Sequence, residues 1–132
     1  MTHEFEFRVY YEDTDAAGIV YYANYLRFIE RARTEALLAS GLSQNILRED
    51  HGVVFAVREA HAEYLAPARL EDRLTVSSRV MHMTGARIHM NQDVVRSGIL
   101  LVRCSVVLVA LGLDGRPRRI PGPVREALSR TC

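Results

Sequence analysis

Three carboxylates, Glu12, Asp13 and Asp15, fall within four positions, and Gly18 follows them closely. Carboxylates packed this closely discourage one another's ionisation, so one of them can have a raised pKa and act as a general acid or base. Two other interpretations compete with this one. The aspartates can serve the turn, because aspartate readily bonds nearby backbone N–H groups, or they can open a calcium-binding loop.

The calcium interpretation fails on the spacing of its ligands. If Asp13 is the first position of a calcium loop, Gly18 takes the sixth position as required. Ala17 then occupies the fifth position, which needs an oxygen ligand, and Asn24 the twelfth, which needs a bidentate glutamate. On residue chemistry alone, the structural turn and the catalytic carboxylate both remain open.

The elements on either side of the acids follow from hydrophobic periodicity. Apolar residues alternate with polar ones through Phe5–Tyr11 and predict a half-buried strand that ends near Glu12. Beyond the acids, apolar residues recur every three or four positions through Tyr25–Ala36, which predicts an amphipathic helix. Ser40-Gly41 supplies its stop, because glycine tolerates the left-handed conformation that closes helices.

The start of this helix matters for chemistry. Asn24 is the best capping residue by propensity, and an earlier start near Tyr21 is the alternative. In either case the first N–H groups lack partners inside the helix and carry partial positive charge. Such a helix start can stabilise an oxygen atom that becomes negative during a reaction.

The rest of the chain predicts mainly strands. A connector with a short helical turn through Gln44–Glu49 leads into four runs with strand periodicity, and a parity shift near Arg58 predicts a bulge. The most apolar run, Ile99–Leu113, is typical of a central strand buried on both faces. Pro123 can start a last short helix. The four runs cover residues 53–64, 74–80, 87–94 and 99–113.

Together these elements predict an α+β fold. One long helix with an apolar stripe must bury it, and a largely antiparallel five-stranded sheet is the only large surface available to receive it. We therefore expect one domain over residues 1–132, with the sheet wrapped around the helix. A single layer of this kind leaves sheet edge uncovered, which favours pairing with a second copy.

Composition excludes several classes of function. The 17 basic and 16 acidic side chains nearly cancel, so no bulk field favours nucleic acid or an anionic membrane. We expect neither a signal peptide nor a membrane span, because no apolar run has the required length and flanks. Two cysteines form no disulfide framework and indicate a cytoplasmic protein, with Cys104 in the core and Cys132 exposed.

A basic group near the Thr84-Gly85 turn is the second candidate site. Arg79, His82 and Arg87 flank this turn, and arginine forks match phosphate oxygens well. The group therefore either binds a polyphosphate ligand or is solvated surface. The five histidines show no paired ligand spacing, so we expect no metal. The absence of a Gly-x-Ser-x-Gly elbow and of a phosphate loop disfavours serine and nucleotide hydrolases.

Three stretches carry a resemblance to a known family. The segments Tyr11–Tyr25, Glu30–Glu35 and Glu63–Asp72 resemble the 4-hydroxybenzoyl-CoA thioesterase family, most of all its YbgC-type, Tol-Pal-associated acyl-CoA thioesterases. The similarity runs from about Phe7 to Val109. It implies a hot-dog fold, in which the long helix is the sausage and the sheet the bun. It also implies a homodimer or homotetramer that binds acyl-CoA at the subunit interface.

The resemblance assigns roles to two residues. The family's catalytic carboxylate is the second aspartate of an Asp-x-Asp motif, a position held here by Asp15. A backbone N–H at the helix start, here that of Tyr22, polarises the thioester carbonyl. The carboxylate then attacks the carbonyl or activates a water, and both routes stay open. Many YbgC-type members have histidine in place of Tyr22, so a histidine-assisted mechanism is disfavoured, whereas a backbone donor is unaffected.

The expected activity is hydrolysis of a short-chain or aromatic acyl-CoA, or of an acyl carrier protein thioester, without a cofactor. Arg79, His82 and Arg87 are then the candidates for binding the coenzyme A phosphates. Two alternatives remain, a non-catalytic acyl-CoA-binding or regulatory hot-dog dimer and a hot-dog dehydratase. The presence of Asp15 disfavours the first, and the missing histidine-led motif of dehydratases disfavours the second.

Overall fold

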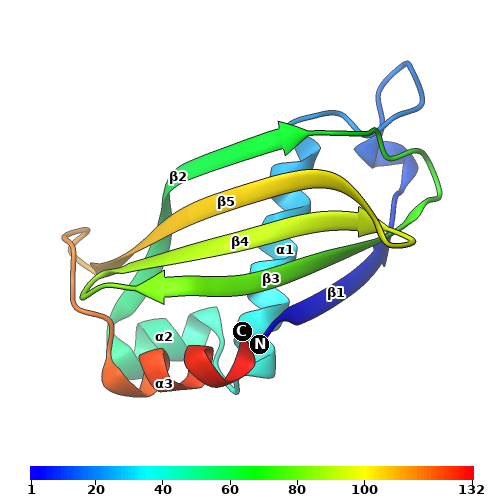
Figure 1. Ribbon diagram of the computed structural model, residues 1–132. Helices are drawn as coiled ribbons and strands as arrows, with labels where there is room; N and C mark the ends of the chain where they lie inside the picture. Colours follow the sequence, from blue (N-terminus) through cyan, green and yellow to red (C-terminus); the bar gives the residue numbers. More distant parts are fainter.

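The computed structural model describes residues 1–132 and has the predicted α+β architecture (Figure 1). Five antiparallel strands form one sheet in the order β1-β3-β4-β5-β2. The sheet curves around the long helix α1, Asn24–Ala39, which is the arrangement of a hot-dog fold. The strands are β1 His3–Arg8, β2 Val53–Tyr64, β3 Arg73–Met83, β4 Arg87–Arg96 and β5 Ile99–Gly112.

Helix α1 confirms the predicted amphipathic pattern. Its inner stripe packs on the concave face of the sheet, and Phe28 and Ala32 are fully buried there. The prediction that Asn24 caps the helix is wrong, because Ala23 holds the N-cap position and makes no side-chain cap. Asn24 is the first helical residue instead, and its side-chain Nδ2 donates to Asp13 Oδ1 at 2.9 Å.

Strand β1 is shorter than the periodicity predicts. It ends at Arg8, and the chain then turns through a short 3-10 helix, η1, at Tyr11–Asp13. The reason lies far along the chain: the Val9 N–H donates to Asp72 O at 2.9 Å, and the Glu71 N–H donates to Val9 O at 3.0 Å. Val9 therefore pairs with a loop and leaves the ladder between β1 and β3.

Two further strand predictions have different outcomes. The bulge predicted near Arg58 is confirmed, because the register between β2 and β5 shifts between Val57 and Glu59. The prediction that β5 is buried on both faces is wrong. Its residues alternate, so that Cys104 faces the core while Arg103 and Ser105 on either side are exposed. One face of β5 packs on the helix, and the other carries the exposed Arg103 and Ser105 together with the half-buried Val107, Val109 and Leu111.

Two short helices, α2 and α3, close the end of the domain beyond the C-terminus of α1 (Figure 1). Helix α2, Gln44–His51, is capped by Ser43, whose Oγ accepts from the Ile46 N–H at 3.0 Å. Helix α3, Gly122–Thr131, returns to β3. Cys132 is buried there, contrary to prediction, and its carbonyl accepts from the Val80 N–H at 3.0 Å. None of the helices is long and apolar enough to cross a membrane.

Candidate active site

The acids of the loop before α1 differ in their surroundings, and Asp13 is the buried one. Only 4% of Asp13 is exposed. Its Oδ2 accepts from the Tyr10 N–H at 2.8 Å, and its Oδ1 accepts from Asn24 Nδ2 at 2.9 Å. Its carbonyl accepts from the Tyr21 N–H at 3.0 Å. Asp13 therefore joins the segment after β1, the loop and the start of α1.

Asp15 is exposed and makes few side-chain contacts. One carboxylate oxygen, Oδ1, accepts from the Ala17 N–H at 2.8 Å, and the other has no hydrogen-bond partner in the protein. The backbone around it is fixed, since the Asp15 N–H donates to Ile19 O at 2.9 Å and the Gly18 N–H donates to Asp15 O at 3.0 Å. Gly18 has φ of +77°, a value that favours glycine. This tight loop presents a carboxylate with one free oxygen.

A second loop, residues 66–72, braces the first. The Val20 N–H donates to Ala68 O at 2.9 Å, and Tyr25 Oη accepts from the Ala68 N–H at 3.1 Å. Burial raises the pKa of the Tyr25 hydroxyl. Asp72 Oδ2 accepts from the Arg69 N–H and from Arg96 Nη1, both at 2.8 Å. Partial burial acts to raise the pKa of Asp72, but these two hydrogen bonds outweigh it and the pKa is lowered.

Asp15 and the start of α1 line one hollow of about 310 Å³. The N–H groups of Tyr22 and Ala23 at this helix start have no acceptor within the chain. The Tyr22 side chain points elsewhere: 62% of the residue is exposed, and its ring packs edge-on against Tyr64 with centroids 6.1 Å apart. The exposed carboxylate of Asp15 therefore shares this hollow with Ala23, whereas Tyr22 does not belong to its lining. A carboxylate together with unpaired backbone donors can attack a polarised carbonyl or activate a water molecule.

The hollow also contains residues that the sequence analysis did not single out as functional. Asn24 and Arg27 line it from the first turn of α1, where they lie three residues apart on one helical face. That spacing is the only signal for them in the sequence. Tyr64, at the end of β2, does not line the hollow but packs against Tyr22 and Tyr25. No local pattern links it to a loop some forty residues earlier, because the sheet makes this contact.

The basic group lies apart from Asp15 within one chain. Arg79 and His82 belong to β3 and Arg87 to β4, near the hairpin at the end of the sheet opposite η1 (Figure 1). The His82 ring stacks on that of His89, with centroids 4.1 Å apart and planes 12° apart. Arg79 and His82 line one shallow hollow that does not include Arg87, and all three residues lie away from the acidic loop. No group of three or more potential metal-ligating side chains is present.

Comparison with known proteins identifies the family. The thioesterase-like superfamily matches residues 9–128. The chain is 43% identical to the acyl-CoA thioester hydrolase YbgC of Escherichia coli O6:H1, over 86% of both chains. It is 39% identical to the acyl-CoA thioesterase YbgC of Haemophilus influenzae, over 93% of this chain and 91% of the relative.

Solved structures agree with this assignment. The crystal structure of Slr0204, a 1,4-dihydroxy-2-naphthoyl-CoA thioesterase from Synechocystis, matches with a TM-score of 0.89 and 26% identity. The match covers 98% of this chain and 96% of that one. The fold is therefore that of hot-dog thioesterases. The chain belongs to the thioesterase-like superfamily, and its sequence is similar to those of YbgC-type acyl-CoA thioesterases.

Proposed function

We propose that this protein hydrolyses acyl-CoA thioesters and that Asp15 supplies the catalytic carboxylate. Family membership and the names of the YbgC relatives support the reaction. The observation that carries the assignment of Asp15 is its exposed carboxylate, which has one unbonded oxygen and shares a hollow with the start of α1. Asp13 cannot take this role, because both of its oxygens are bonded and it is buried.

The chemistry needs only the carboxylate, a backbone donor and water. In one route an Asp15 oxygen attacks the thioester carbonyl carbon, the C–S bond breaks, and water then hydrolyses the mixed anhydride. In the other, Asp15 takes a proton from water, the resulting hydroxide attacks, and the thiolate leaves and is protonated. In both routes the Tyr22 N–H stabilises the negative carbonyl oxygen. A donor of this kind contributes a factor of about a hundred to a thousand in rate.

The test is thiol release from a panel of acyl-CoAs by wild type and by Asp15→Asn. The variant keeps the acceptor oxygen for the Ala17 N–H and removes the charge, so it should fold and lose at least a hundredfold in rate. Glu12→Gln is the matched control, because it removes an exposed charge from the same loop. Full activity in Asp15→Asn, or equal losses in both variants, would contradict the proposal.

Isotope labelling separates the two routes. After a single turnover in ¹⁸O-labelled water, the nucleophilic route leaves ¹⁸O in the enzyme whenever water attacks the carboxyl carbon of Asp15 in the mixed anhydride. The general-base route places ¹⁸O only in the released acid. Mass spectrometry of the peptide that contains Asp15 reads this difference.

We propose short-chain or aromatic acyl groups as the substrate class. Tyr21, Tyr22 and Tyr64 form a partly exposed aromatic wall beside the helix start. Aromatic rings favour stacked or edge-on contacts with a second aromatic group. One related protein is named 1,4-dihydroxy-2-naphthoyl-CoA hydrolase, which is consistent with an aroyl substrate here. The acyl-CoA panel should therefore include benzoyl and hydroxybenzoyl thioesters beside aliphatic ones, and an acyl carrier protein thioester.

We also propose that the protein works as a homodimer, or as a tetramer of such dimers. Strand β2 is at the edge of the sheet, and Val57 on it is 51% exposed. The neighbouring Leu26 of α1 is 41% exposed. An open edge beside apolar side chains is suited to antiparallel pairing with a second copy. Light scattering of wild type and of Val57→Arg, which places a charge at an exposed position of this edge strand, tests this interface.

The basic group of Arg79, His82 and Arg87 remains our candidate for the coenzyme A phosphates. Because it lies at the far end of the sheet from Asp15, only a second copy can bring it to the same ligand. Arg79→Gln with Arg87→Gln should then raise KM for an acyl-CoA. The KM for the corresponding acyl-pantetheine, which lacks the nucleotide phosphates, should stay unchanged.

A further inference from the structure

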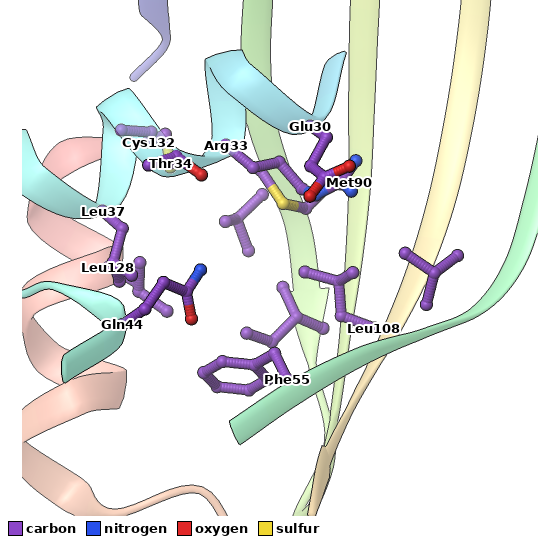
Figure 2. Close-up of a pocket in the computed structure, with 14 residues that line it drawn as sticks. Glu30, Arg33, Thr34, Leu37, Gln44, Phe55, Met90, Leu108, Leu128 and Cys132 are labelled. Carbon is purple, nitrogen blue, oxygen red and sulfur yellow. The ribbon is translucent and has the colours of Figure 1, made fainter. Parts of the chain in front are cut away.

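A second cavity, of about 320 Å³, lies beneath the later turns of α1 (Figure 2). Helices α1, α2 and α3 enclose it together with the concave face of the sheet. Most of its wall is apolar, with Leu37 and Leu128 on the helices facing Phe55, Met90 and Leu108 on the strands. An engineered apolar cavity of about 150 Å³ binds benzene, so this one has room for an aromatic ring or a short acyl chain.

Two charged side chains of α1, Glu30 and Arg33, line this wall, and neither takes part in an ion pair. Burial lowers the pKa of Arg33 and outweighs the nearby Glu30 carboxylate, which acts to raise it. Arg33 Nη1 donates to Gln92 Oε1 at 2.9 Å, and none of the ion pairs in the structure includes Arg33. Gln92 is fully buried, and its Nε2 donates to Ile29 O and to Ser78 Oγ, both at 2.9 Å. These two bonds orient the glutamine oxygen towards Arg33.

The guanidinium therefore has unused hydrogen-bonding capacity. It carries five N–H donors, and the protein uses one of them. Burial lowers the pKa of Arg33, yet arginine stays charged in proteins. In Figure 2 its side chain extends along the cavity wall towards Met90. A partly buried cation with free donors beside an apolar cavity suits a ligand oxygen atom, above all one with negative charge.

We propose that this cavity receives the acyl group and that Arg33 selects acyl groups with an apolar body and an oxygen-bearing far end, a carboxylate or a hydroxyl. This inference rests on the hydrolase function proposed above and adds a specificity-determining residue to it. The apolar wall binds the body of the acyl group through its surface area. Arg33 adds a directional hydrogen bond, which rejects an analogue that lacks the oxygen.

The position of the cavity indicates whether Asp15 of the same chain or of a second copy acts on an acyl group bound there. Arg33 is nine residues beyond Asn24, the first residue of α1. It therefore lies about 13 Å along the helix axis from the helix start beside Asp15 of the same chain. A smaller hollow of about 220 Å³ shares Glu30, Arg33 and Val57 with the cavity and is lined by residues of α1, β2 and β5. This hollow runs from the cavity to the β2 edge, where we propose the second copy pairs.

Antiparallel pairing at that edge brings two ends together. The Tyr64 end of one β2 then lies beside the Val53 end of the other. Because Tyr64 packs against Tyr22 in each chain, the acidic loop of one copy approaches the cavity of the other. The acyl group bound in one chain would thus be hydrolysed by Asp15 of the second copy.

The test compares acyl-CoAs matched in length that differ in the far oxygen. Adipoyl against hexanoyl probes a carboxylate, and 4-hydroxyphenylacetyl against phenylacetyl probes a phenol. Wild type should favour the oxygenated member of at least one pair in kcat/KM. Arg33→Met should lower that preference about ten- to a hundredfold, the value of a hydrogen bond to a charged group. Arg31→Met, two residues away and outside the cavity lining, is the matched control.

Both the carboxylate pair and the phenol pair of substrates can support or overturn the proposal. The pair that responds identifies the ligand oxygen. No preference in wild type, or a preference that survives in Arg33→Met, would overturn the proposal. Because Arg33→Met leaves Gln92 Oε1 unpaired, Arg33→Lys is measured beside it. Lysine keeps the charge without the planar fork, so the preference should fall less than in the methionine variant.

A binding measurement separates this inference from the proposed function. Calorimetry with Asp15→Asn compares its affinities for adipoyl-CoA and hexanoyl-CoA and for the phenylacetyl pair, with Arg33 intact and with Arg33→Met added. A preference that depends on Arg33 supports the cavity assignment even if Asp15 is not the catalytic group. Equal affinities within both pairs reject the assignment even if Asp15→Asn abolishes hydrolysis.

Mixed dimers test which copy supplies the carboxylate. A dimer of one Asp15→Asn chain and one Arg33→Met chain contains one intact site if the carboxylate comes from the other copy. Its activity on the preferred oxygenated substrate should be about half that of wild type. If cavity and carboxylate belong to one chain, neither site is intact, and activity close to zero would overturn this arrangement.

Discussion

Replacing Asp13 by asparagine should destabilise the fold, although the acid lies two residues from the proposed catalytic group. Asp13 is 4% exposed, and each of its oxygens accepts one hydrogen bond, from the Tyr10 N–H and from Asn24 Nδ2. An asparagine at this position keeps one acceptor and turns the other oxygen into an NH₂ group. That group then faces a donor, whichever way the amide is oriented.

The size of the effect follows from the loss of one bond and the weakening of the other. A hydrogen bond to a charged group contributes about 1.5–3 kcal/mol, and a buried donor left without an acceptor costs about 1–3 kcal/mol. We therefore expect the free energy of unfolding to fall by about 3 kcal/mol in Asp13→Asn. In a domain of this length, such a loss lowers Tm by about 10 °C.

Thermal and urea denaturation measure this loss, with Asp15→Asn as the matched control. The control changes an exposed carboxylate whose bonded oxygen it retains, so its Tm should lie within about 2 °C of wild type. In the double variant Asp13→Asn/Asn24→Asp, amide and carboxylate exchange places, and part of the stability should return. If Asp13→Asn has the same Tm as the control, the hydrogen bonds of Asp13 do not stabilise the loop and the reasoning is wrong.

Two further predictions concern the hydrogen bonds of the second loop, residues 66–72. Tyr25→Phe removes the acceptor of the buried Ala68 N–H, so urea denaturation should show a loss of about 2 kcal/mol, and an unchanged midpoint would refute this. The folded pKa of Asp72 is lowered, so the folded state binds fewer protons than the unfolded state near its ordinary pKa of about 4. Its stabilising contribution is therefore complete above that pH and is lost as pH falls through the folded value. The stability difference between wild type and Asp72→Asn should shrink below about pH 4, and a constant difference from pH 3 to 7 would contradict this.

Elements with a strong local pattern could be predicted from the sequence. Helix α1 and the five strands show periodicities of 3.6 and 2, and the parity shift at Arg58 marks a real bulge. The errors fall where distant contacts decide the structure. The end of β1 depends on the pairing of Val9 with Asp72, and the burial of Cys132 depends on its contact with Val80. Neither partner is visible in the local sequence.

In the candidate site, too, features with a local sequence pattern could be predicted, and features set by distant contacts could not. The acidic cluster and the helix start adjoin in the sequence, so their juxtaposition was predictable, and the resemblance pointed to Asp15. The structural role of Asp13 was not predictable, because Asn24 resembled a helix cap and instead bonds the acid. The cavity beside Arg33 could not be predicted at all, since three helices and four strands enclose it.

The contrast between Asp13 and Asp15 suggests how the loop keeps a reactive group accessible. A carboxylate bonded at both oxygens is a poor nucleophile or base, because reaction must first break those bonds. The structure places such bonds on Asp13, which holds the loop against Tyr10 and α1. Asp15 can then stay exposed with a single bond while its backbone, fixed by Ile19 and Gly18, holds it in place. Support and reactivity are thus divided between two aspartates two residues apart, and the opposite effects expected for their asparagine variants test this division directly.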